Sequence, residues 1–107
     1  MTTRQTVSID VFAGTFESQP LAFAHLYDLA KALDIEIALD AVEVICKADP
    51  VKRLTHYFDA RQVNAIIDEM GLNTSLILIF PEAMTGALEG STLLIPLGRF
   101  DGTRPRP

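Results

Sequence analysis

Two apolar segments in the second half of the chain, residues 76–80 and residues 93–100, each end in a phenylalanine. A short continuous apolar run of this kind is typical of a strand that is covered on both faces of a sheet. Pro81 cannot donate a backbone hydrogen bond to a neighbouring strand, so the first of these strands should end there. Pro96 marks the second strand, expected over residues 93–97, as an edge strand or the site of a bulge. The chain should therefore contain a sheet with a buried central strand.

A first helix is expected shortly after residue 18. Ser18 can cap its start, and Pro20 suits its first turn because the N–H that proline lacks would be unpaired there in any case. Apolar residues then recur at helical spacing, which predicts the face that packs on the sheet. The residues expected on that face are Phe23, Leu26, Tyr27, Ala30 and Leu33.

Two more helices are expected in the middle of the chain. Asp49 and Pro50 fit the N-cap and first position of a short helix that runs to residue 57. A longer helix is expected over residues 60–70, because Gly71 is a natural residue for its C-terminal stop. The residues expected on its inner face are Val63, Ile66, Ile67 and Met70.

Alternating apolar residues predict the remaining strands. Residues 6–13 alternate in part, and residues 35–46 alternate with a change of face near Asp40, where we expect a bulge or turn followed by a strand over residues 42–46. We therefore predict an α+β fold: one compact domain over residues 1–101, with a sheet of four to five strands and three helices packed on it. Residues 102–107 contain no apolar side chain, which predicts a disordered tail.

The negative charge of the chain lies in its first half. Residues 1–49 contain eight acidic and three basic residues, whereas residues 50–107 contain six of each. An acidic surface repels the phosphates of nucleic acids but attracts a basic protein and steers its approach. We therefore expect a protein partner and no direct nucleic-acid binding. The alternative is that the acidic residues simply form a solvated face that keeps the chain soluble.

Few residues suggest chemistry. Cys46 lies in an apolar strand context, where a thiol stays protonated and inert, and as the only cysteine it cannot form an intramolecular disulfide. His56 with Tyr57 and Asp59 could form a general-base cluster, but a surface or capping histidine is the more common case. Neither His56 nor His25 has a second ligand at metal-binding spacing. We therefore expect no catalysis, no metal and no cofactor.

The chain also lacks the usual signals for membranes and export. No apolar run approaches the ~20 residues that a membrane-spanning helix needs. The N-terminal region has no basic segment followed by a long apolar one, because polar and charged residues interrupt it. We therefore expect a cytoplasmic protein without a membrane partner.

Four short segments in order resemble a known family. They are VFAGTFES at residues 11–18, an acidic stretch at residues 39–43, LILIFPEAM at residues 76–84 and LGRFDG at residues 97–102. In this order they are similar to the immunity protein 22 family of bacterial polymorphic toxin systems. The chain departs from the family pattern in having no tryptophan, and in having Pro81 where a second acid usually stands. The resemblance implies an α+β protein that neutralises a toxin, such as a nuclease, by binding it stoichiometrically.

Together, charge and resemblance predict a non-catalytic immunity protein that presents an acidic surface to a basic toxin domain. The residues that we expect to contact the toxin are Glu36, Asp40 and Glu43, with Glu17, Glu82, Tyr57 and Arg99 as further candidates and Phe58 as an additional aromatic. A second interpretation is a small homo-oligomeric α/β module, such as a homodimer, that binds a ligand or regulates another protein. A third is an enzyme that uses His56 or Cys46, which would require these residues to meet in a pocket.

Overall fold

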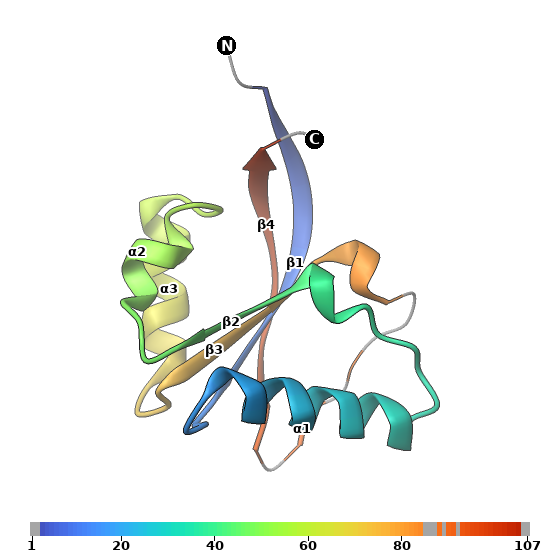
Figure 1. Ribbon diagram of the computed structural model, residues 1–107. Helices are drawn as coiled ribbons and strands as arrows, with labels where there is room; N and C mark the ends of the chain where they lie inside the picture. Colours follow the sequence, from blue (N-terminus) through green and yellow to red (C-terminus); the bar gives the residue numbers. More distant parts are fainter. Residues whose placement is uncertain (1–2, 85–87, 89, 92, 106–107) are drawn as a thin grey trace.

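The protein forms one four-stranded sheet with helices on both faces (Figure 1). A computed structural model describes residues 3–84, 88, 90–91 and 93–105. The strands lie in the order β2-β3-β1-β4, and each neighbouring pair is antiparallel, which confirms the predicted α+β class. The elements are β1 (Arg4–Gly14), α1 (Gln19–Ala32), η1 (Leu39–Ala41), β2 (Val42–Cys46), α2 (Pro50–Leu54), α3 (Ala60–Met70), β3 (Ser75–Ile79), η2 (Pro81–Ala83) and β4 (Ile95–Pro105), where η denotes a 3-10 helix.

Strand β3 is the central apolar strand that the sequence predicts. All five of its residues are buried, and it lies between β2 and β1. Because side chains alternate across a strand, Leu76 and Leu78 join one hydrophobic core, while Ile77 and Ile79 join another on the opposite face. Strand β3 therefore connects the two cores.

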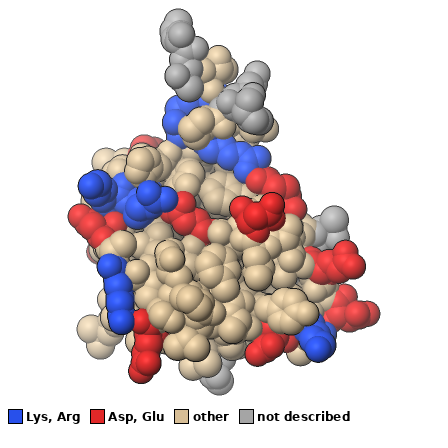
Figure 2. Space-filling model, viewed as in Figure 1, with Lys and Arg blue, Asp and Glu red and all other residues tan. Residues whose placement is uncertain are grey.

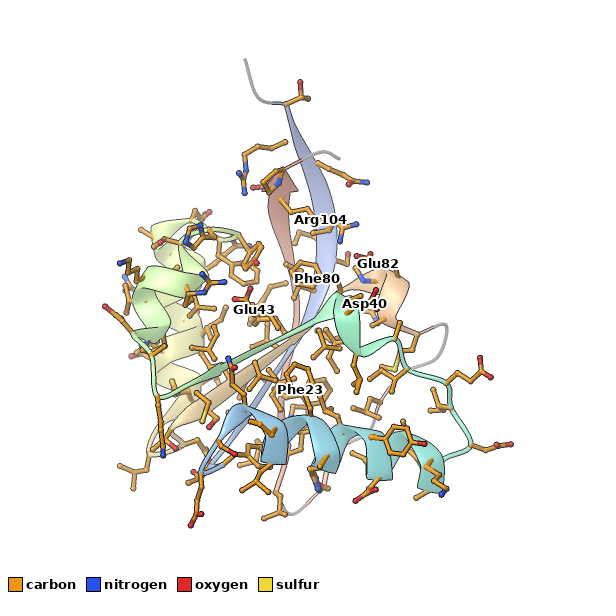
Figure 3. All side chains as sticks on the ribbon, viewed as in Figure 1. Phe23, Asp40, Glu43, Phe80, Glu82 and Arg104 are labelled. Carbon is orange, nitrogen blue, oxygen red and sulfur yellow. The ribbon has the colours of Figure 1, made fainter. Side chains whose placement is uncertain are left out.

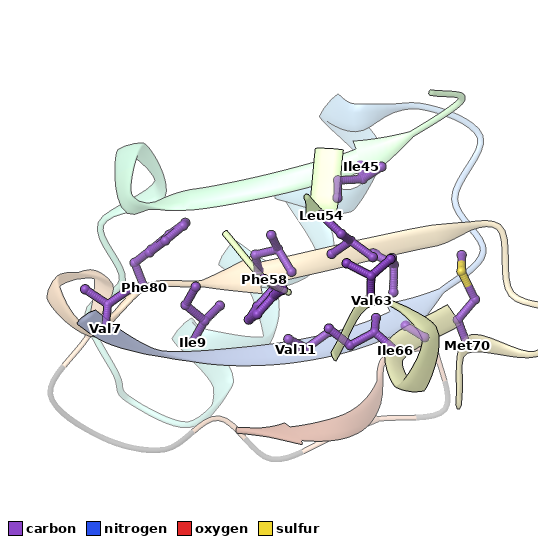
Figure 4. Close-up of a cluster of buried hydrophobic side chains, with 13 residues drawn as sticks. Val7, Ile9, Val11, Ile45, Leu54, Phe58, Val63, Ile66, Met70 and Phe80 are labelled. Atoms are coloured by element: carbon purple, nitrogen blue, oxygen red, sulfur yellow. The ribbon is translucent and has the colours of Figure 1, made fainter. Parts of the chain in front are cut away.

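Each face of the sheet has its own helical cover. On one face α2 and α3 cover a core that contains Ile9, Leu54, Phe58 and Ile66, which Figure 4 shows from within. On the other face Leu26 of α1 belongs to a second core together with Phe12 and Ile77. The sheet is thus the middle of three layers, a common arrangement for one domain.

The predicted helix starts are confirmed. The Ser18 hydroxyl accepts a hydrogen bond from the N–H of Leu21 at 3.4 Å, and the Asp49 carboxylate accepts one from Val51 at 3.0 Å. Asp59 caps α3 in a reciprocal arrangement with Gln62, the third residue of the helix. Helix α3 has the predicted bounds, whereas α2 ends at Leu54, before the predicted end at residue 57.

The predicted inner face of α1 is partly wrong. Tyr27 and Leu33 are 55% and 40% exposed, respectively. The fully buried residues of α1 are instead Ala22, Leu26 and Ala30. The two alanines let the helix lie close to the sheet, so the larger side chains beside them reach only its margin.

Two predictions, of a strand over residues 35–38 and of a disordered tail from residue 102, are also wrong. Residues 35–38 form no strand; the alternation there belongs to a loop whose Ala38 N–H donates to the Ala83 carbonyl at 2.7 Å. The turn near Asp40 is η1, and the strand after it is β2 with the predicted bounds. Residues 102–105, predicted as part of a disordered tail, belong to β4 and pair with the start of β1. Residues 106–107 lie outside the described part.

Strand β4 is an edge strand with the irregularity that Pro96 predicts. Its register against β1 shifts between Val11 and Phe12, opposite Gly98, whose φ of 126° favours glycine. The sequence favours a loop over residues 86–91, of which residues 86, 87 and 89 lie outside the described part. No helix in the described residues is long and apolar enough to cross a membrane.

Candidate protein-binding face

The outer edge of β2 lies on the face of the molecule that Figure 1 presents to the reader, between α1 and α2. A shallow groove of about 310 Å³ follows this edge. We call it the edge groove; it is lined by Gln19, Phe23, Asp40, Ala41, Val42, Glu43, Val44, Tyr57 and Phe80. Figure 3 shows Phe23, Asp40, Glu43 and Phe80 around it. The groove combines aromatic rings, which are enriched in protein interfaces, with acidic side chains, which attract a basic partner.

Glu43 is held by two side chains from the α2 region. Arg53 donates to its carboxylate at 2.8 Å, and the hydroxyl of Tyr57 donates to the same oxygen at 2.7 Å. Burial raises the pKa of Tyr57 to about 12, and the hydrogen bond to Glu43 contributes in the same direction. The hydrogen bond to Glu43 likewise raises the pKa of Arg53. The charge of Glu43 is therefore compensated by Arg53, and its side chain forms part of the wall of the edge groove.

Asp40 and Glu36 lie on an exposed segment next to this groove. Residues 34–40, which we call the acidic segment, connect α1 to β2 and carry exposed Asp34, Glu36 and Asp40. None of these three takes part in the ion pairs found among the described residues. Two open hollows of about 420 and 610 Å³ lie beside the segment and include half-buried Ile35 and Ile37.

Charge is unevenly spread over the face that contains the edge groove (Figure 2). The lower middle of this face carries no charged side chains, whereas acidic side chains lie above it and along its right-hand side. The acidic segment contributes to that side, and Lys31 at the end of α1 lines the same hollow as Asp34 and Glu36. An uncharged centre with a charged rim is the usual anatomy of a protein interface.

Two further predicted residues are engaged within the fold. Arg104 pairs with Glu82 and lies over the ring of Phe80, 5.4 Å from its centroid. The hydrogen bond from Arg104 lowers the pKa of Glu82. Arg99 donates to Asp10 at 2.9 Å across β1 and β4, and so lies on the opposite edge of the sheet from β2.

The last predicted contact residues divide between surface and core. Glu17 is exposed in the turn before α1, near the start of the helix rather than beside the acidic segment. Phe58 is 6% exposed and belongs to the core, where it meets Phe100 edge-on. The structure therefore brings Asp40, Glu43 and Tyr57 together at one groove, whereas Glu36 lines the two hollows along the acidic segment.

The residues considered for catalysis do not form one cluster. Asp59 is occupied as a helix cap, and the Tyr57 hydroxyl is directed at Glu43 rather than at His56. The Cys46 thiol donates to the carbonyl of Phe16 at 3.3 Å, which ties β2 to the turn before α1. In the described part of the chain, no group of three or more histidine, cysteine or acidic side chains is arranged to hold a metal.

The structure also gives contacts to three residues that the sequence did not predict for them. Gln19 donates its side-chain amide to the carbonyl of Val44 at 2.8 Å and so covers part of the β2 edge. Phe23 lines the edge groove, and His25 lies 3.0 Å from the hydroxyl of Ser91. A glutamine at the first position of a helix carries no signal for such a contact, because the neighbouring strand is 25 residues away in the sequence.

Comparisons of the chain with known proteins do not identify a family. No family model, no curated protein and no solved structure matches it.

Proposed function

We propose that this protein is a non-catalytic immunity protein that binds a basic bacterial toxin domain, such as a nuclease, and neutralises it. The proposal combines the resemblance of four sequence segments with one structural observation. That observation is the acidic segment, whose exposed carboxylates border the uncharged lower middle of the face in Figure 2. A basic partner would be steered by these carboxylates and would then cover the groove next to them.

The contributions of the predicted residues differ in this proposal. Asp40 and Glu36 supply the long-range attraction, because they are exposed and unpaired among the described residues. Glu43 contributes to the groove wall instead, since Arg53 already neutralises it. Phe23 and Tyr57 offer the aromatic contacts that commonly dominate binding energy.

The test uses the polypeptide encoded beside this gene, with its C-terminal domain as the candidate toxin. The double variant E36K/D40K should associate with that domain at least about tenfold more slowly at low salt, because the steering charge is reversed. The matched control is D68K/E69K, which makes the same charge change on exposed residues of α3. Stopped-flow binding and growth rescue of toxin-producing cells measure the effect.

Two results would contradict the proposal. The first is the absence of a complex between the unaltered chain and the neighbouring polypeptide. The second is an equal loss of association rate in E36K/D40K and D68K/E69K, because net charge rather than the acidic segment would then control binding. A chain that forms a dimer by sedimentation, and buries Asp40 in doing so, would favour the homo-oligomeric interpretation.

A further inference from the structure

We propose that the outer edge of β2 accepts an extended segment of the partner as a fifth strand, parallel to β2, with a lysine or arginine of that segment against Asp40. This inference rests on the proposed function and names the way in which the partner is held. It starts from the backbone groups along β2, continues with the groove walls, and ends with the charge.

The hydrogen-bond pattern shows which backbone groups of β2 point outward. The N–H of Phe80 donates to the carbonyl of Ala41, so these two residues form a hydrogen-bonded pair at the start of the β2–β3 ladder. Such pairs alternate in an antiparallel ladder, which makes Glu43 and Ile45 the next residues of β2 bonded to β3. Val42 and Val44 therefore direct their N–H and C=O groups away from β3, toward the free edge.

Two of these four outward groups already have partners. The Val42 N–H donates to the Leu39 carbonyl in the turn of η1, and the Val44 carbonyl accepts from Gln19. The Val42 carbonyl and the Val44 N–H have no side-chain or loop partner among the described residues. A strand edge thus presents one free acceptor and, two residues later, one free donor.

This pair of groups fits one residue of a parallel strand. In a parallel ladder a residue donates to the carbonyl of one neighbour and accepts from the N–H two positions later on the adjacent strand. A partner residue opposite Glu43 would donate to Val42 and accept from Val44. An antiparallel strand would instead need both groups of Val42 or both groups of Val44, and each residue offers only one.

The same argument disfavours a second copy of this chain as the occupant. Two copies of β2 related by a two-fold axis would pair antiparallel, which the occupied groups oppose. Of the two acidic side chains that line the edge groove, Glu43 is paired with Arg53, and Asp40 remains to attract a basic segment as the complementary occupant.

The direction of the added strand determines which part of the partner segment lies next to Asp40. Asp40 lies two residues before β2, at the N-terminal end of the edge groove. Because the added strand runs parallel, the residues that precede its paired residue pass Asp40. We therefore expect a lysine or arginine there, followed by apolar residues that contact Phe23 and the groove floor.

The experiment titrates the isotope-labelled chain with a capped peptide of sequence Lys-Lys-Val-Thr-Val. The peptide of reversed sequence is the control, since it has the same composition and charge. The Val44 amide should shift in the NMR spectrum, and its hydrogen exchange should slow about tenfold when nine-tenths of the chain is bound. Asp40→Lys should abolish the effect, whereas Asp68→Lys should preserve it.

Three outcomes would overturn the inference: no change at Val44 at millimolar peptide, equal binding of the reversed peptide, or a Val44 shift that follows protein concentration without peptide. The first two do not bear on toxin neutralisation, because the acidic segment could bind a toxin through side chains alone, whereas the third would favour the homo-oligomeric interpretation. Conversely, Val44 protection by the peptide with no toxin complex would contradict the proposed function and leave the strand addition standing.

Discussion

A single hydroxyl group helps Arg53 to hold Glu43 in the fold. Tyr57 donates to the same carboxylate oxygen that receives Arg53, and its ring also meets Phe80 edge-on at 5.2 Å. Tyr57→Phe keeps the ring and removes only this donor. The variant should lose about 0.5–1.5 kcal/mol of unfolding free energy at neutral pH, as is usual for one hydrogen bond. Urea denaturation measures the loss, and Tyr27→Phe on exposed α1 should leave the stability unchanged.

The same residue predicts a pH dependence. The pKa of Tyr57 is raised to about 12 in the folded state, from an ordinary value of 10.0. The folded state therefore retains the phenolic proton at a pH where the unfolded chain releases it. This stabilisation is complete below pH 10 and is lost as the pH rises toward 12. The difference in unfolding free energy between the unaltered chain and Tyr57→Phe should decrease over that pH range. A difference that stays constant would contradict the role of the hydroxyl.

At the scale of elements, the C-terminal end of β4 forms a regular strand although it has no large apolar side chain. Gly102 is buried, and a Cβ atom added there would lie 2.8 Å from the Tyr57 carbonyl and 3.0 Å from the Phe58 ring. Gly102→Ala should therefore cost about 1–3 kcal/mol of unfolding free energy, because the strand must move away from the loop after α2. The measurement is the midpoint of urea unfolding.

The control for that substitution lies next to it on the same strand. Asp101 is exposed and its carboxylate accepts one hydrogen bond, from the Ser8 hydroxyl at 2.9 Å, so Asp101→Ala should cost less than about 1 kcal/mol. Equal effects of the two substitutions would mean that β4 does not pack closely against residues 57–58 in solution.

These elements also show what a sequence can predict. Helix α3 and strands β2 and β3 have local signals, namely a capping aspartate, a stop glycine and unbroken apolar runs, and their predicted bounds are close to the observed ones. Residues 102–105 have none, because they are held by pairing with Arg4 to Val7, almost 100 residues away. The alternation over residues 35–38 wrongly predicted a strand, because half-buried and exposed residues alternate in this loop as they do in a strand.

The candidate site divides in the same way. Exposure of Glu36 and Asp40 follows from their place between apolar residues, and it is observed. The neutralisation of Glu43 by Arg53 and Tyr57, and the outer position of β2, both depend on which elements become neighbours in space. Neither could be read from local sequence, since α2 reaches β2 only once the sheet has formed.

At the scale of the whole molecule, the central question is whether the two cores unfold together. They lie on opposite faces of one sheet, with α1 over one and α2 and α3 over the other. Strand β3 contributes fully buried side chains to both cores. If the helices on one face detach, apolar residues of β3 become exposed to water, and the same strand supports the core on the opposite face. A single cooperative transition is therefore expected for a domain of this size.

The two tyrosines provide a probe for each side. With no tryptophan in the chain, Tyr27 reports on α1 and Tyr57 on the α2 side, and each can be followed alone after the other is changed to phenylalanine. Leu26→Ala removes a fully buried side chain beneath α1 and should cost about 2–5 kcal/mol. Because β3 links the cores, this loss should lower the urea midpoint by the same amount for both probes. Ile66→Ala beneath α3 should do likewise from the opposite side. A Leu26→Ala variant in which Tyr27 reports early unfolding, while the Tyr57 transition stays in place, would show that the two layers fold independently.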